Sequence, residues 1–172
     1  MELLCGIIPE DHPGLIRPYR KMYQAYTHSA DRDRQIFCLE KAAQAGDREC
    51  MGLLGVMLLR DDRPQEGLLW LERAVRLNDI PSTRILGQLY LGSKVLHRDL
   101  KKGLYLLNQA ASQSDPEANR LLGQIYLGHS KQTAGRISID PRLALEYLCK
   151  AKSLGATGTA ALIREAESLL ML

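Results

Sequence analysis

The stretch that decides the fold is Leu-Gly-Gln-Leu-Tyr-Leu-Gly at residues 86–92, which returns as Leu-Gly-Gln-Ile-Tyr-Leu-Gly at residues 122–128. Each copy follows a segment with helical spacing that ends in small residues, Ala74-Val75 and Ala110-Ala111. A block that recurs at a period of about 20 to 50 residues is typical of repeat proteins, in which each unit buries its apolar face only against its neighbours. The sequence therefore predicts a stack of helical hairpins.

Equivalent positions in successive units fix the register of the repeat. Four alanines anchor it: Ala42, Ala74, Ala110 and Ala151. Each is followed by a residue type that ends helices or tolerates a left-handed backbone: Gly46, Asn78, Ser114 and Gly155. An acid that suits the start of a helix comes next in three units: Asp47, Asp79 and Asp115. Before the anchors stand Asp31, Arg63, Asp99 and Asp140, three of which are natural N-caps.

The spacing of the units varies while their helices stay constant. Successive anchors lie 32, 36 and 41 residues apart, and the growth is confined to the connections at 60–62, 93–98 and 129–139. Insertions at one edge of a stack are expected in repeat proteins. Glycines within the helices, at Gly55, Gly87 and Gly123, would each cost about 1 kcal/mol against alanine. We therefore expect a neighbouring helix to pack very closely at each of them.

This order of residues resembles the Sel-one-like repeat (SLR) family, a relative of the tetratricopeptide repeats, over residues 31–170 and best over 79–128. The chain departs from the family pattern at Arg60, usually glycine, and at Gly67 and Gly103, usually alanine. The resemblance implies an all-α fold, a right-handed α-solenoid of about nine antiparallel helices. We expect a single repeat domain over 1–172, with a non-repeat segment at 1–13, hairpins over 14–155 and a capping helix over 156–172.

Composition restricts the classes of function. A net charge of +3 and the absence of a basic run argue against nucleic acid. The sequence contains no stretch long enough to span a membrane. The first residues lack the basic start of a signal peptide, so we place the chain in the cytoplasm, although a leader removed beforehand stays open. The cysteines at 5, 38, 50 and 149 occupy four different repeat positions, a pattern that favours reduced thiols over disulfides.

The sequence offers no catalytic motif. Its four histidines stand at unrelated positions, and none pairs with a cysteine or an acid at metal-ligand spacing. A phosphate-binding loop and a G-x-S-x-G nucleophile turn are both absent. We therefore predict no catalytic residue, no metal site and no cofactor.

In three of the four hairpins, the first helix carries an arginine and a glutamine one turn apart, here named the ladder, and the second hairpin has Gly52 and Val56 at these positions instead. In solenoids of this kind the first helices line the concave face. Arginine binds a carboxylate through its planar fork, glutamine pairs with peptide groups, and leucine offers an apolar anchor. A peptide or protein segment that carries carboxylates is the predicted partner. The predicted contacts are Arg20, Gln24, Arg84, Gln88, Leu91, Arg120, Gln124 and Leu127.

Two features also have a purely structural interpretation. The arginines and glutamines also fit a solvated helix face, or arginines that pair with the nearby Glu49 and Glu117. The longest connection, residues 129–139, carries Lys131 and Arg136 and is expected to be mobile. It is either a functional loop or a tolerated insertion at the edge of a repeat.

These observations predict a non-enzymatic protein–protein interaction module, an adaptor, a scaffold or a specific inhibitor-type partner. The resemblance implies a bacterial envelope, secretion or signalling pathway. The alternative is an enzyme of the penicillin-binding or β-lactam-hydrolysing type reported for some family members. Residues 1–13 and the apolar ends of the stack leave self-association open.

Overall fold

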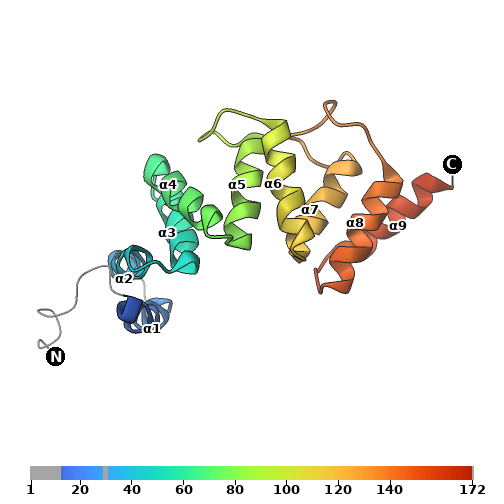
Figure 1. The fold of residues 1–172 in the computed structure, drawn as a ribbon. Coiled ribbons are helices and arrows are strands. Elements are labelled where there is room, and N and C mark those ends of the chain that lie inside the picture. The colour runs from blue at the N-terminus through green and yellow to red at the C-terminus, as the bar shows by residue number, and fades with distance from the viewer. Residues whose placement is uncertain (1–12, 29–30, 172) are drawn as a thin grey trace, which may run out of the picture. The chain divides into compact units, whose positions relative to one another are not determined.

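The computed structural model describes residues 13–28 and 31–171, and every regular element in this part of the chain is a helix (Figure 1). A short 3₁₀ turn, η1 (Pro13–Leu15), comes first. The α-helices that follow are α1 (Ile16–Tyr26), α2 (Arg32–Gln44), α3 (Arg48–Arg60), α4 (Pro64–Arg76), α5 (Ile80–Gly92), α6 (Leu100–Ser112), α7 (Pro116–Tyr126), α8 (Pro141–Ser153) and α9 (Thr159–Leu170). The predicted all-α fold is confirmed. The segment predicted to lie outside the repeat, residues 1–13, falls almost wholly outside the described residues.

The helices gather into two compact units that divide between Ser82 and Thr83, early in α5. In the first unit α1 packs on α2, α2 on α3, and α3 on α4. In the second unit α6 packs on α7, α7 on α8, and α8 on α9. Within each unit, these helices therefore lie beside the next one along the chain, as a series of hairpins requires.

Helix ends fall where the repeat pattern placed them. Asp31, Asp99 and Asp140 each accept a hydrogen bond at the start of the helix that they cap, and Arg63 caps α4 without one. After the helices that carry the anchor alanines, the predicted stop residues adopt positive φ angles of 97°, 58°, 63° and 89°: Gly46, Asn78, Ser114 and Gly155. A left-handed residue after a helix lets its last carbonyls be satisfied and turns the chain back.

The glycines inside the helices mark points where two backbones nearly touch. A Cβ at Gly55 on α3 would lie 2.8 Å from the carbonyl oxygen of Gly67 on α4. At Gly87 on α5 the corresponding distance, to the carbonyl of Gly103 on α6, is 3.1 Å. The predicted close approach is confirmed, and it explains why glycine is kept there despite its low helix propensity.

Leucine and alanine side chains fill the space between helices. In the first unit Leu39, Leu54 and Leu58 are fully buried around Ala42 and Ala74. In the second unit the cluster at α7, α8 and α9 is built on Leu127, Leu148, Ile163 and small alanines. Fully burying one such leucine contributes about 1.5–3 kcal/mol. The repeat positions thus serve as the core positions.

The cysteines within the described residues are unpaired. Cys38 and Cys50 are buried and Cys149 is exposed; Cys5 lies outside the described residues. Burial, then the neighbouring Asp47 carboxylate, raises the pKa of the Cys50 thiol to about 12. Cys50 is therefore a packing residue at neutral pH.

None of the described helices is both long and apolar enough to cross a membrane.

Candidate functional site

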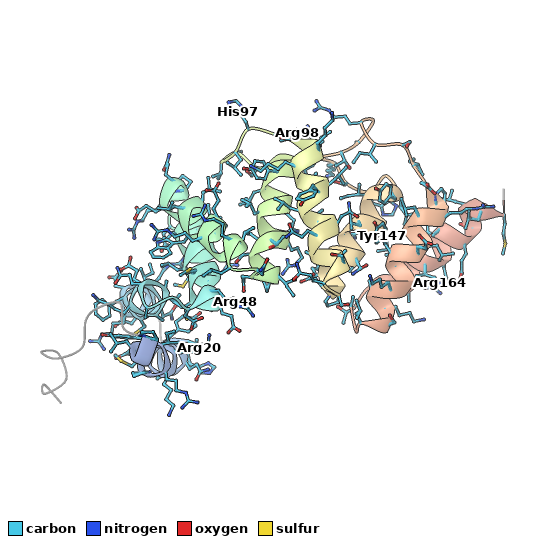
Figure 2. The ribbon with its side chains drawn as sticks, in the orientation of Figure 1. Arg20, Arg48, His97, Arg98, Tyr147 and Arg164 are labelled. Atoms are coloured by element: carbon cyan, nitrogen blue, oxygen red, sulfur yellow. The ribbon has the colours of Figure 1, made fainter. Side chains whose placement is uncertain are left out.

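Arg20 lies on α1 (Figure 2), and its guanidinium reaches the start of α3. Its guanidinium donates hydrogen bonds of 2.6–2.9 Å to the carboxylate of Asp47, the N-cap of α3. It also lies 3.0 Å from Glu49. Burial would raise the pKa of Asp47, but the hydrogen bonds from Arg20 and the Cys50 thiol outweigh it and the net pKa is lowered. Arg20 thus links one hairpin to the next.

The two arginines of the second unit are also engaged. Asp115 is the N-cap of α7, and its Oδ1 lies 3.3 Å from Arg84 Nε. This nitrogen is buried and makes no hydrogen bond. This contact is therefore an ion pair without hydrogen-bond alignment. Arg120 donates two hydrogen bonds to Glu117 on its own helix, which raise the pKa of Arg120 and lower that of Glu117. The pairings with Glu49 and Glu117 that the sequence left open are both present.

A single rule covers the arginine column, which consists of Arg20, Gly52, Arg84 and Arg120. The arginine of one hairpin meets the N-cap aspartate of the next wherever both are present, as in Arg20–Asp47 and Arg84–Asp115. Gly52 replaces the arginine in α3, and Ser82 of α5 occupies the space that a Cβ would need. After Arg120 the aspartate position is Ala156, so Arg120 turns to Glu117 instead.

The glutamines of the ladder behave differently from the arginines. Gln24 is exposed on α1, in the first unit. Gln88 on α5 and Gln124 on α7, in the second unit, line one pocket. Neither of these two side chains makes a hydrogen bond within the described chain. Their carboxamides keep both a donor and an acceptor available.

The predicted aliphatic row is not on the surface. Leu91 and Leu127 are each only 5% exposed. Leu127 packs in the core with Ala144 and Leu148, because it follows directly on the last turn of α7 and faces α8. Leu91 contributes to the pocket but offers little area of its own. Leu91 and Leu127 are therefore not exposed anchors, and their contact with a partner stays a prediction.

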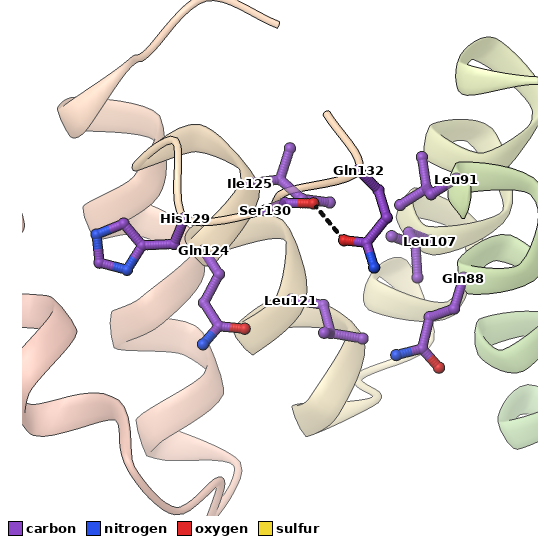
Figure 3. Close-up of a pocket in the computed structure, with 9 residues that line it drawn as sticks. All are labelled: Gln88, Leu91, Leu107, Leu121, Gln124, Ile125, His129, Ser130 and Gln132. Carbon is purple, nitrogen blue, oxygen red and sulfur yellow. Dashed lines mark hydrogen bonds between the residues drawn. The ribbon is translucent and has the colours of Figure 1, made fainter. Parts of the chain in front are cut away.

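The pocket in the second unit has a volume of about 220 Å³ (Figure 3). Its floor is apolar, and buried Leu91, Leu107 and Ile125 line it beside half-buried Leu121. Its polar lining consists of Gln88, Gln124, His129, Ser130 and Gln132. No carboxylate, guanidinium or ammonium group is among the lining residues.

Part of the pocket wall comes from the long connection between α7 and α8, residues 129–139, here named the insert. Gln132 lies against Gly92 at the end of α5, where a Cβ would come within 2.5 Å of Gln132 Cγ. Thr133 is buried, with 2% exposure, while Lys131 and Arg136 face solvent. The insert is folded onto the helices here, which the sequence did not predict. The length of the connection and the small residue at Gly92 were the available signals.

His129 forms the other polar contact of the insert. Its Nε2 lies 2.8 Å from Glu165 Oε1 on α9. The adjacent Ser130 directs its hydroxyl to Gln132 Oε1 at 3.1 Å, and no hydrogen bond joins Ser130 to the His129 ring within the described residues. A serine, a histidine and an acid lie near one another, but the bond that would activate the serine is not formed. No cluster of three metal-ligand side chains occurs in residues 13–28 and 31–171.

Comparison with known families fits this architecture of stacked hairpins. The Sel1 repeat model matches four segments of the chain, residues 29–47, 50–79, 82–115 and 116–155. The molecule is thus an α-solenoid of helical hairpins. The chain belongs to the Sel1 repeat family, as its resemblance predicted. Proteins built from these repeats are generally protein–protein interaction modules and are usually non-enzymatic.

Two solved structures resemble the chain. A Sel1 repeat protein from Oxalobacter formigenes gives a TM-score of 0.76 at 19% identity, over 95% of this chain and 67% of that one. A protective antigen present in uropathogenic Escherichia coli strains, which displays an SLR fold, gives 0.72 at 18% identity, over 91% of this chain and 33% of that one. The chain thus spans about a third of the second protein, and the likeness concerns the fold. No curated protein matches the sequence.

Proposed function

We propose that the protein is a non-enzymatic adaptor that holds an extended segment of another protein on α5 and α7, the first helices of the hairpins in its second unit. One observation carries this proposal. Gln88 and Gln124 occupy the same position in successive hairpins and line one pocket, with carboxamides that no described residue satisfies. A carboxamide pairs with a peptide group through one donor and one acceptor. Equivalent residues of successive repeats suit a partner that is itself periodic.

The charge of the segment is a separate question. The sequence predicted carboxylates on the partner because of Arg20, Arg84 and Arg120. Each of these arginines already contacts an aspartate or a glutamate of this chain, and a paired guanidinium gains less from a second carboxylate. We therefore propose a segment that is uncharged where it meets the two glutamines. An acidic partner stays a prediction, and the ion pairs count against it.

The proposal is tested on an identified partner. The full chain, immobilised, captures proteins from its source cells, and calorimetry then measures the purified pair. Changing both Gln88 and Gln124 to alanine should weaken binding by about tenfold or more, since each lost hydrogen bond contributes about 0.5–1.5 kcal/mol. Gln65→Ala, at an exposed glutamine of α4, is the matched control and should leave the affinity unchanged. An affinity that the double change does not alter would refute the proposal.

Salt and arginine variants decide the charge of the segment. Affinity for an uncharged segment should change less than about threefold between 50 and 500 mM salt, because screening acts on exposed charges. The change of Arg84 and Arg120 to alanine should then reduce stability more than affinity. A steep salt dependence, with affinity lost and the thermal midpoint unmoved, would restore the acidic partner.

The enzyme alternative has one supporting observation, the proximity of Ser130 to the His129–Glu165 pair. Because Ser130 bonds to Gln132, we expect no turnover of a chromogenic β-lactam. Turnover that Ser130→Ala abolishes would favour the enzyme over the adaptor. The unpaired thiols fit a reducing compartment, and on this basis we propose a cytoplasmic location.

A further inference from the structure

We infer that the pocket beneath the insert takes one uncharged aliphatic side chain of the partner, of leucine or methionine size, with the peptide groups beside it bound by glutamine carboxamides. The inference deepens the proposed function and rests on it. It assigns to the insert, which interrupts the regular repeat, the role of selecting which residue of the segment is held. Size, charge and polar arrangement of the pocket each support it.

The volume restricts the occupant to one side chain. A cavity of about 150 Å³ holds a benzene-sized group, and sites for whole small molecules are larger, about 300–1,000 Å³. The pocket measures about 220 Å³. It therefore has room for a single side chain and part of the adjoining backbone, and too little room for most metabolites.

The charge of the lining excludes ionised side chains. Leu107 is fully buried at the floor, and Leu91 and Ile125 are 5% and 4% exposed. A lysine or glutamate side chain there would lose its hydration and find no opposite charge among the lining residues. The one titratable neighbour, His129, is already bonded to Glu165. An aliphatic side chain meets only favourable contacts.

The polar groups surround this apolar floor. Figure 3 shows Gln88 and Gln124 on either side of Leu121, with Gln132 across from them. Ser130 donates to Gln132 Oε1, which fixes the Gln132 carboxamide and leaves its Nε2 as a donor. Carboxamides beside an apolar floor match a peptide, which carries an amide on each side of every side chain. The insert supplies His129, Ser130 and Gln132, three of the five polar lining residues, and a hairpin without it would lack them.

The test uses three probes that differ only in side chain: N-acetyl-leucinamide, N-acetyl-lysinamide and N-acetyl-glutamic acid α-amide. Their binding to the full chain is followed by nuclear magnetic resonance of the glutamine side-chain amides. The leucine probe should shift the amides of Gln88, Gln124 and Gln132, with a dissociation constant on the order of 1 mM, as expected for a ligand of this size. The two charged probes should bind at least about tenfold more weakly.

Filling the pocket gives a second arm. Leu121→Trp should abolish the shifts, whereas Leu69→Trp, at a leucine of α4 with 46% exposure, should leave them intact. If Leu121→Trp perturbs the fold, the double change of Gln88 and Gln124 to alanine takes its place and should also abolish binding. Equal binding of a charged probe, or no shift at these glutamines with the leucine probe, would overturn the inference. Concentration-dependent shifts without any probe would point to a second copy of the chain and would overturn it too.

The outcomes separate this inference from the proposed function. If an identified partner binds Leu121→Trp as well as the unchanged protein, but loses affinity when Gln88 and Gln124 change, the adaptor stands and the pocket inference fails. If the leucine probe binds as described while the partner is indifferent to both glutamines, the pocket stands as a site for amides and the adaptor proposal fails.

Discussion

The hairpins α3–α4 and α7–α8 are built on the same repeat but differ in how their helices are joined. Three residues, Asp61–Arg63, connect α3 to α4, whereas residues 127–140 connect α7 to α8. The short connection joins α3 and α4 directly, and its Asp61 pairs with Arg32 of α2. The long one folds back over the end of α5 and encloses a pocket. The repeat thus supplies the helices that form the apolar floor of the pocket, and the long connection adds His129, Ser130 and Gln132 to its lining.

The largest difference between the two units is expected where glycines allow two helices to pack closely. Gly55→Ala should lower the free energy of unfolding by about 2–3 kcal/mol, because its Cβ would meet the Gly67 carbonyl at 2.8 Å. Gly87→Ala occupies the same repeat position in the second unit, where the nearest atoms lie at 3.1–3.2 Å. There we expect a change below about 1 kcal/mol, since the gain in helix propensity offsets a small shift. Urea unfolding followed by circular dichroism measures both, and equal losses would contradict this difference in packing.

The arginine–aspartate contacts offer a second comparison. Asp47→Asn should reduce stability by about 1–2 kcal/mol, less than for a fully buried pair because Arg20 is 40% exposed. Asp115→Asn should cost about half as much or less, since Arg84 approaches Asp115 without hydrogen-bond alignment. Asparagine keeps the N-cap oxygen in both cases. Thermal unfolding at neutral pH compares them, and a larger loss at Asp115 would reverse the ranking.

Acid should remove the contribution of Asp47. Its pKa in the folded protein lies below the ordinary value, so its stabilisation is fully present above about pH 4 and fades as the pH falls through the folded value. The difference in unfolding free energy between the unchanged protein and Arg20→Met should therefore shrink from about pH 6 to about pH 2.5. A difference that stays constant over this range would show that Arg20 acts through packing alone.

The smallest effect is expected where the insert meets α5. Gly92→Ala places a Cβ against the Gln132 side chain, which is exposed and belongs to the insert, so global stability should change by less than about 1 kcal/mol. The insert should nevertheless loosen, and amide hydrogen exchange over residues 131–137 should become faster. Gly46→Ala is no suitable control, because Gly46 has φ 97°. Gln65→Ala on α4 serves instead and should leave the exchange of the insert unchanged.

The sequence was sufficient for the fold and insufficient for the pocket. Periodic anchors such as Ala74 and left-handed stops such as Asn78 repeat at fixed spacing, and each is decided by local backbone geometry. The arginine column was harder, because Arg20 and Arg120 have the same repeat position but different partners, set by Asp47 and by the alanine at 156. The partner of each arginine depends on the residue at the start of the neighbouring hairpin. The sequence of one helix alone does not show which residue that is.

The insert was hardest to predict. Its composition, with Lys131 and Arg136, indicated a solvated loop, and those two side chains do face solvent. Gln132 and Thr133 pack against the helices through contacts that no periodicity encodes. Leu91 shows the opposite case, a residue expected at the surface that is buried. It follows Gln88 by three residues on α5, but its side chain packs toward Gly103 on α6.

The link from Arg20 to the cap of the following hairpin also bears on how such proteins change by recombination. Duplicating a hairpin that has both the arginine on its first helix and the aspartate N-cap would retain an arginine–aspartate contact like those of Arg20 with Asp47 and of Arg84 with Asp115. The hairpin with Gly52 is different, because its neighbour fills the vacated space with Ser82. A side chain introduced at Gly52 would therefore require Ser82 to move.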